Sequence, residues 1–188
     1  MFWLISLIAT NIFCYFLPFL IQFSGSSSDS FQNFLAMGWK SNREIASGEY
    51  YRLLTSTFLH GDEIHLLVNM YSLWSIGGIS MSVFGTTGFG LIYFLSGLGG
   101  SLASFFFNAN PSVGASGAIF GLVGALLALG IQTNNFGLIN SIFITIVINV
   151  AIAFLPGSRL DNWGHLGGIL TGFVVSFVLL SLQIGLPN

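Results

Sequence analysis

Charged residues are so scarce along this chain that a water-facing surface cannot be built from it. The 188 residues include four Lys and Arg, six Asp and Glu, and 54% apolar residues. Charged residues make up 5% of the chain, whereas an ordinary soluble domain has about 25%. The mean hydropathy of +0.86 agrees with this imbalance. We therefore predict an integral membrane protein.

Six segments are long and apolar enough to cross a bilayer, which requires about 20 mostly apolar residues. None of them contains Asp, Glu, Lys or Arg, and they cover roughly 2–23, 64–84, 88–107, 114–131, 136–155 and 163–182. The first is interpreted as a span and not as a signal peptide, because it lacks a basic start and a small-residue cleavage pattern. The predicted fold class is an all-α membrane protein, a six-transmembrane-helix bundle forming one domain over residues 1–188.

The connection between the first two spans, residues 24–63, is by far the longest. It opens with the polar stretch SGSSSDS, which predicts a flexible segment, and continues as FQNFLAMGWK. In that second stretch Phe31, Phe34, Leu35 and Trp39 recur near helical spacing, which is typical of a short helix lying in the membrane interface. We expect a large, partly helical first loop at the interface.

Composition and cysteine usage exclude several classes of partner. The net charge of −2 leaves no basic patch that pairs with phosphates, so nucleic acid is not an expected partner. The single cysteine, Cys14, cannot form an intramolecular disulfide. His60 is expected at the interface and His65 on a different face, and no fourth ligand is evident. We expect neither a metal nor a cofactor.

Polar residues inside the predicted spans are candidates for function, because burying them in lipid is costly. His65 and Asn69 are four residues apart and share one face of the second span. His165 opens the sixth span, where Gly168 and Gly172 follow on the same face.

The fourth span carries a second set of small residues, Gly117, Gly121 and Gly124, which directly follows Ser116. Small residues at this spacing let helix backbones approach closely in lipid. If the glycine seams of the fourth and sixth spans meet, Ser116 and His165 lie on neighbouring turns near one membrane face.

A serine within reach of a histidine is the minimum requirement for nucleophilic acyl transfer. Free backbone N–H groups at the start of the fourth span, with His65 and Asn69 side chains, are candidate donors for an oxyanion. Structural interpretations stay open as well: Ser116 as a helix N-cap, the glycines as a packing seam, and Asn69 as an interhelical hydrogen-bonding group. Asp161, four residues before His165, is a further candidate for orienting the imidazole.

Four ordered motifs resemble those of the rhomboid family of intramembrane serine proteases, in its six-span bacterial form. They are the aromatic–Arg element in EYYRLLTSTFLH (residues 49–60, carried by Tyr51 and Arg52), HxxxN in HLLVNM (65–70), GxSG in GASG (114–117) and the histidine with its glycine stripe in GHLGGILTG (164–172). The resemblance implies a single rhomboid-type transmembrane domain and a serine endopeptidase.

The resemblance also implies a role for each matching residue. Ser116 corresponds to the nucleophile and His165 to the base of a dyad that requires no acid. His65 and Asn69 correspond to oxyanion-binding residues, acting with the backbone N–H of Ser116. Phe120 occupies the place of an aromatic residue, often tyrosine, that packs on the catalytic histidine.

Substrates and orientation follow from the same resemblance. Its implied substrates are transmembrane helices of other proteins in the bilayer, and its implied location is a bacterial plasma membrane. The implied N-terminus is cytoplasmic and the active site opens to the outside. The positive-inside rule suggests the reverse, because Lys40, Arg43 and Arg52 lie in the first loop. Four ordered motifs outweigh so few charges.

Two other function classes stay open at this point. One is a catalytically silent rhomboid-like protein that binds transmembrane helices, for which loss of the serine or the histidine would be the signature. The other is a small transporter or channel, although such proteins usually show internal repeats and none is evident here.

Overall fold

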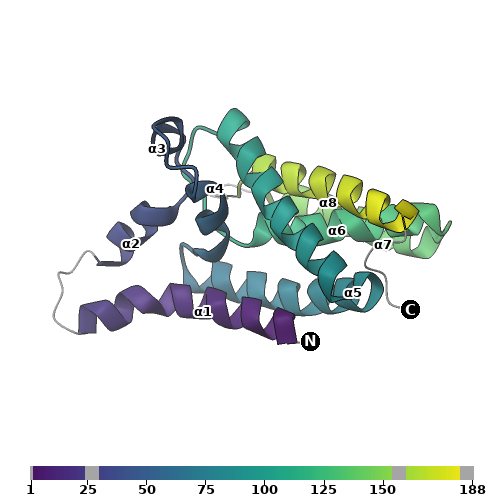
Figure 1. The fold of residues 1–188 in the computed structure, drawn as a ribbon, viewed down its shortest axis with the longest axis horizontal. Coiled ribbons are helices and arrows are strands. Elements are labelled where there is room, and N and C mark those ends of the chain that lie inside the picture. Colours follow the sequence, from purple (N-terminus) through teal and green to yellow (C-terminus); the bar gives the residue numbers. More distant parts are fainter. Residues whose placement is uncertain (1, 24–29, 154–159, 183–188) are drawn as a thin grey trace.

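The computed structural model describes residues 2–23, 30–153 and 160–182, and within them the chain is folded as a helical bundle (Figure 1). The elements in chain order are α1 (Phe2–Phe23), α2 (Ser30–Gly38), α3 (Asn42–Ala46), α4 (Arg52–Thr55), the 3₁₀ turn η1 (Ser56–Phe58), α5 (Glu63–Phe107), α6 (Ser116–Gln132), α7 (Phe136–Ala153) and α8 (Asn162–Leu182). The predicted all-α membrane fold is confirmed. Two parts of the prediction lie outside the described residues: 24–29 of the flexible stretch SGSSSDS, whose last residue Ser30 begins α2, and the end of the fifth span at 154–155.

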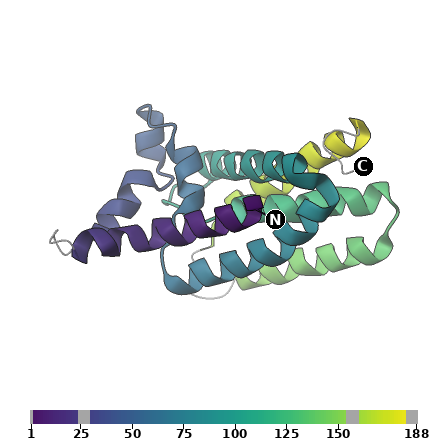
Figure 2. The same ribbon diagram turned by 60° about the horizontal axis from the view of Figure 1, so that its bottom comes forward.

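The second and third predicted spans are the two arms of α5, which has 45 residues. Gly85 interrupts the helix with φ 65° and ψ −179°, a conformation that glycine adopts without a steric penalty. The chain reverses there, so that the arms at 63–84 and 86–107 fold back on one another (Figure 2). By length and composition α1, α5 and α8 are long enough to span a membrane, whereas α6 and α7 are shorter apolar helices.

Helix α6 lies at the centre of the bundle. Its buried residues run through the whole helix from Ala118 to Gly130, which is the pattern of a helix that is apolar on every side and enclosed by others. The outer helices expose large apolar side chains such as Phe13, Phe143 and Val174. In a membrane protein these side chains face lipid.

The close approach of α6 and α8 depends on glycines of both helices. A Cβ atom added at Gly168 would lie 2.0 Å from the carbonyl oxygen of Gly117, and one added at Gly172 would lie 1.9 Å from that of Gly121. Both distances are far below van der Waals contact, so no other residue fits at either position unless the helices separate. The predicted meeting of the two glycine seams is confirmed.

The first loop is folded and held together by buried polar contacts. The expected interfacial helix is α2, and α3, α4 and η1 follow it. Arg52 is only 5% exposed, and its guanidinium forms a 2.7 Å ion pair with Glu49 and donates to the carbonyl of Ala36 at 2.7 Å. The aromatic–Arg element therefore holds the end of α2 against α4.

The glycine contact predicts a large effect from one added methyl group. We expect Gly168→Ala to lower the free energy of unfolding by about 1–3 kcal/mol, because it overpacks the α6–α8 contact. Gly78→Ala in α5 is the matched control, since a Cβ there meets nothing within 4 Å; we expect it to be neutral or to stabilise by up to about 1 kcal/mol. Equilibrium unfolding in detergent micelles measures both, and equal stabilities would contradict the account.

Candidate active site

The segment from 108 to 115 joins α5 to α6 and delivers Ser116. Its last turn is held by a hydrogen bond from the Gly114 backbone N–H to the Ser56 carbonyl at 2.9 Å. Gly114 has φ 128°, and a Cβ there would lie 2.7 Å from Nε2 of His65. Glycine is thus required by both backbone conformation and space.

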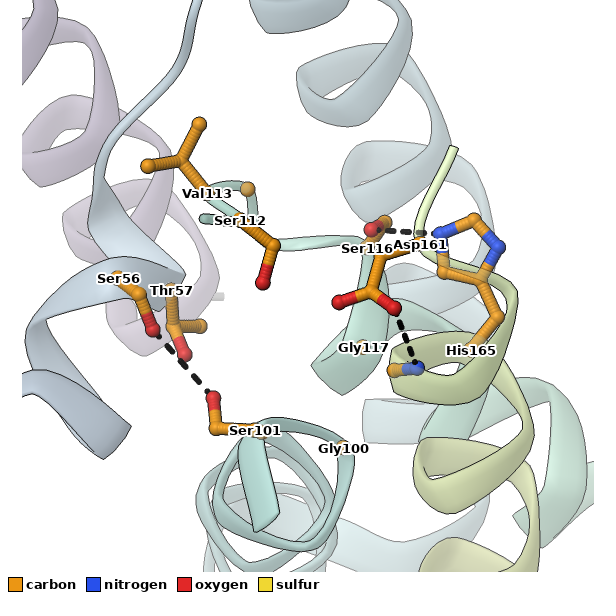
Figure 3. Close-up of a pocket in the computed structure, with 13 residues that line it drawn as sticks. Ser56, Thr57, Gly100, Ser101, Ser112, Val113, Ser116, Gly117, Asp161 and His165 are labelled. Atoms are coloured by element: carbon orange, nitrogen blue, oxygen red, sulfur yellow. Dashed lines mark hydrogen bonds between the residues drawn. The ribbon is translucent and has the colours of Figure 1, made fainter. Parts of the chain in front are cut away.

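Ser116 and His165 meet across the α6–α8 contact. Ser116 is the first residue of α6 and His165 lies in the first turn of α8. The serine Oγ is 2.8 Å from the histidine Nε2, as Figure 3 shows. The predicted proximity is confirmed. In the neutral tautomer with its proton on Nδ1, Nε2 accepts this hydrogen bond and is able to take the hydroxyl proton.

Helix α6 begins without a side-chain cap. The N-cap position is Ala115, which makes no side-chain cap bond, and the first intrahelical bond there runs from the Ile119 N–H to the Ala115 carbonyl. The N-cap interpretation of Ser116 is therefore wrong, because its hydroxyl is turned to His165. The backbone N–H groups of the first turn have no intrahelical acceptors, so they remain candidate oxyanion donors beside Ser116.

His65 and Asn69 lie on the face of α5 that is turned to Gly114. The Nδ2 of Asn69 donates to the His65 carbonyl at 3.0 Å, and Asn69 is only 5% exposed. The interhelical hydrogen bond considered for Asn69 is replaced by this bond within its own helix. Both side chains stand beside the segment that leads into Ser116.

The aromatic ring of Phe120 covers the imidazole of His165. The ring centroids are 4.3 Å apart, with 27° between the planes. Stacking of this kind restricts rotation of the imidazole about its side-chain bonds, so it favours the orientation that reaches Ser116. The stacking arrangement implied by the family resemblance is present without a hydroxyl on the ring.

His60 is enclosed by the protein and only 1% exposed. Its ring packs edge-on against that of His65, with centroids 5.1 Å apart. Burial and, to a smaller extent, the neighbouring His65 lower the pKa of His60 to about 3, against the opposing effects of Asp62 and the Phe58 backbone. His60 is therefore a neutral packing residue beneath His65.

Asp161 does not orient the imidazole through its carboxylate. Its Oδ1 accepts from the Gly164 backbone N–H at 3.1 Å and from Nδ2 of Asn108 at 3.0 Å, and its Oδ2 accepts from the Ser104 hydroxyl. Burial works to raise the pKa of Asp161, but these hydrogen bonds outweigh it and hold that pKa below the usual value. Asp161 caps α8. An aspartate directly before the first residue of a helix, as Asp161 is before Asn162, is the sequence signal for that role.

Two cavities reach the serine. One of about 270 Å³ is lined by Trp39, Asp62, His65, Ser116 and His165 among others. A second cavity, of about 30 Å³, also borders Ser116 and is lined in part by polar residues that include Ser56 and Ser101 (Figure 3). Sequence reasoning missed both serines, because the loop and helix that carry them meet only in the folded chain.

The buried, unprotonated state of His60 predicts a loss of stability in acid. Its unfolded pKa is 6.5 and its folded pKa about 3, so the unfolded chain binds the proton first as pH falls. The stability it contributes is full above pH 6.5 and declines toward pH 3, by about 1 kcal/mol between pH 7.5 and 5.5. We expect His60→Phe to remove this part of the pH dependence of unfolding in micelles. Identical losses in wild type and variant would contradict it.

Comparison with known proteins places these features in context. A family model described as the rhomboid domain matches residues 47–182. The chain is 41% identical over 173 residues to rhomboid protease GluP of Bacillus subtilis (strain 168), covering 90% of this chain and 33% of that protein. It is 41% identical over 151 residues to RHOMBOID-like protein 4 of Arabidopsis thaliana, covering 77% of this chain and 38% of that protein.

A third relative is named as lacking activity. Inactive RHOMBOID-like protein 8 of Arabidopsis thaliana is 37% identical over 162 residues, which cover 83% of this chain and 50% of that protein. The chain spans about a third to a half of the length of these curated relatives.

Proposed function

The chain belongs to the rhomboid family, and on that premise we propose that it is an intramembrane serine endopeptidase that cleaves transmembrane helices of membrane-protein substrates. The observation that carries the proposal is the 2.8 Å contact between Oγ of Ser116 and Nε2 of His165. Such a contact supports nucleophilic attack by the serine with the histidine as its base. The roles given below to Ser116, His165, His65 and Asn69 are parts of this proposal.

The proposed reaction has two halves. His165 takes the proton of the Ser116 hydroxyl while Oγ bonds to the scissile carbonyl carbon, and the tetrahedral oxyanion accepts from the Ser116 backbone N–H and from His65 and Asn69. When the C–N bond breaks, His165 returns the proton to the leaving amine and an acyl-enzyme is left on Oγ. Water, deprotonated by His165, then attacks the ester; the bond to Oγ breaks, His165 returns the proton to Oγ, and the acid is released. The reaction needs no metal and no cofactor.

The length of α6 explains how water reaches a site within the membrane. Its 17 residues span about 26 Å at 1.5 Å per residue, less than the ~30 Å hydrocarbon core. If the C-terminal end of such a short helix reaches one membrane surface, its N-terminal end stops short of the opposite surface. Ser116 then lies below that surface, within the membrane. The 270 Å³ cavity above it supplies water. Substrate helices must unwind before attack because their carbonyls are hydrogen-bonded, so segments with helix-weakening residues near the surface are preferred.

The proposal includes the orientation of the protein in the membrane, the kind of membrane and the extent of the domain. We place the N-terminus in the cytoplasm and the cavity on the outside of a bacterial-type plasma membrane, with the lipid bilayer and a substrate helix as the partners. Residues 1–188 form one rhomboid-type transmembrane domain. Because the curated relatives are longer than this chain, activity and substrates are assigned here to that domain alone.

A second candidate function is a catalytically silent protein that binds transmembrane helices. The similarity to inactive RHOMBOID-like protein 8 favours it. The presence of both Ser116 and His165, in hydrogen-bonding contact, favours the protease.

Cleavage of a model transmembrane substrate in liposomes tests the proposal. We expect the wild-type protein to cut, and Ser116→Ala and His165→Ala each to lower kcat/KM by at least about 1,000-fold, because each removes one member of the pair. Ser82→Ala is the matched control: its hydroxyl is exposed and donates to the Ile79 carbonyl of its own helix at 2.7 Å, so full activity is expected.

Two results would overturn this assignment. Equal cleavage by wild type and either variant would show that the pair is not the catalytic machinery. A folded wild-type protein that binds the substrate helix and does not cut it would favour the silent binder.

A further inference from the structure

Lys40, between α2 and α3, is fully buried although it carries a charge. Its Nζ donates to the carbonyls of Asn108 and Asn110 at 2.7 and 2.8 Å and to Oδ1 of Asn42 at 3.0 Å. These three acceptors match the three donors of an ammonium group, which is the condition for burying it at acceptable cost. The ammonium is thus specifically bound by the end of α5 and the segment that follows.

The Lys40 backbone is hydrogen-bonded to the same segment. Its N–H donates to the Ser112 carbonyl at 2.9 Å, and the Ser112 N–H donates to the Lys40 carbonyl at 3.1 Å. Asn108 is the C-cap of α5, so the cation lies at the negative end of that helix, which stabilises it. Through side chain and backbone together, Lys40 holds residues 108–112, which lead into Ser116.

Asp161 carries a negative charge and lies at the N-terminus of α8, whereas Lys40 carries a positive charge at the C-terminus of α5. As the cap of α8, its carboxylate lies at the positive end of the helix dipole, and its own carbonyl accepts from the His165 N–H at 2.9 Å. Asn108 joins the two charged residues, since its carbonyl accepts from Lys40 and its side-chain amide donates to Asp161. A continuous polar chain therefore runs from the first loop to the turn that carries His165.

We propose that Lys40 and Asp161 are paired positioning residues that set the distance between Ser116 and His165. Lys40 acts through the segment that delivers the serine. Asp161 acts through the turn that delivers the histidine, and Figure 3 shows Asp161 beside Ser116 and His165. In the part of the chain that the structure describes, neither side chain makes a hydrogen bond to the Ser116 hydroxyl or to the His165 imidazole. The inference rests on the proposed protease function. A misplacement of about 1 Å at a reacting pair costs on the order of 100-fold in rate, so the network controls turnover more than substrate binding.

Cleavage kinetics of point variants in liposomes test this pairing. Lys40→Met removes the ammonium at similar volume, and Asp161→Asn removes the charge while keeping an oxygen for the cap. We expect each to lower kcat by about 10- to 100-fold with KM within about twofold of wild type. The double variant should lose less than the product of the single losses, because both changes disrupt one network.

Control variants separate the network from general charge loss. Arg43→Met and Glu44→Gln remove charges from the same loop but lie outside the network. Arg43 is exposed, and the Glu44 carboxylate accepts a hydrogen bond from the Ser41 hydroxyl. Both should keep wild-type kinetics. Asn108→Ala is the second probe if Lys40→Met unfolds, since it keeps the carbonyl that Lys40 binds and deletes the amide that reaches Asp161. We expect it to lower kcat with an unfolding midpoint close to that of wild type.

The outcomes distinguish the inference from the function on which it rests. An active wild type, an inactive Ser116→Ala and wild-type kcat in Asp161→Asn and Asn108→Ala would overturn the positioning roles alone. A fall in activity of these variants that follows the folded fraction, or that appears in KM and not in kcat, would overturn them too. Wild-type activity that survives Ser116→Ala would overturn the proposed function itself.

Discussion

The contact between the backbones of α6 and α8 is the constraint on which the site depends. In lipid no hydrophobic force pulls two apolar helices together, so close packing of small residues must do it. Gly168 and Gly172 lie so near the carbonyls of Gly117 and Gly121 that no side chain fits between them. The helices begin on the same side of the bundle, and the contact therefore brings the first turn of one against the first turn of the other. The 2.8 Å approach of Ser116 to His165 is its direct consequence.

The few charges of the chain are used where backbone groups are unpaired. Lys40 binds carbonyls at the end of α5, Asp161 caps α8, and Arg52 binds the carbonyl of Ala36 while paired with Glu49. A membrane protein has no water in its core to satisfy such groups, so each must find a partner within the chain. The polar contacts of the first loop and the loop ends thus fasten the part of the molecule that surrounds the serine, whereas apolar and glycine contacts fasten the helices.

Much of this arrangement could be predicted from the sequence because it depends on local patterns. Span positions follow from runs of apolar residues, and the meeting of Ser116 and His165 follows from glycine spacing and from helix direction. What could not be predicted depends on contacts between segments distant in the chain. The ring of His65 occupies the space beside Gly114. His60 is buried because the first loop folds back over α5. The buried contacts of Lys40 could not be predicted either, because two of its acceptors are carbonyls about 70 residues away in the chain.

The central claim is that the α6–α8 contact activates Ser116 by holding it against His165. An experimental structure of the protein after reaction with a fluorophosphonate, a reagent for activated serines, measures this most directly. We expect phosphorus bonded to Oγ of Ser116, with Nε2 of His165 within hydrogen-bonding distance and a phosphoryl oxygen turned toward His65 and Asn69. An unmodified Ser116, or a modified one with α8 moved away and His165 out of reach, would contradict the claim.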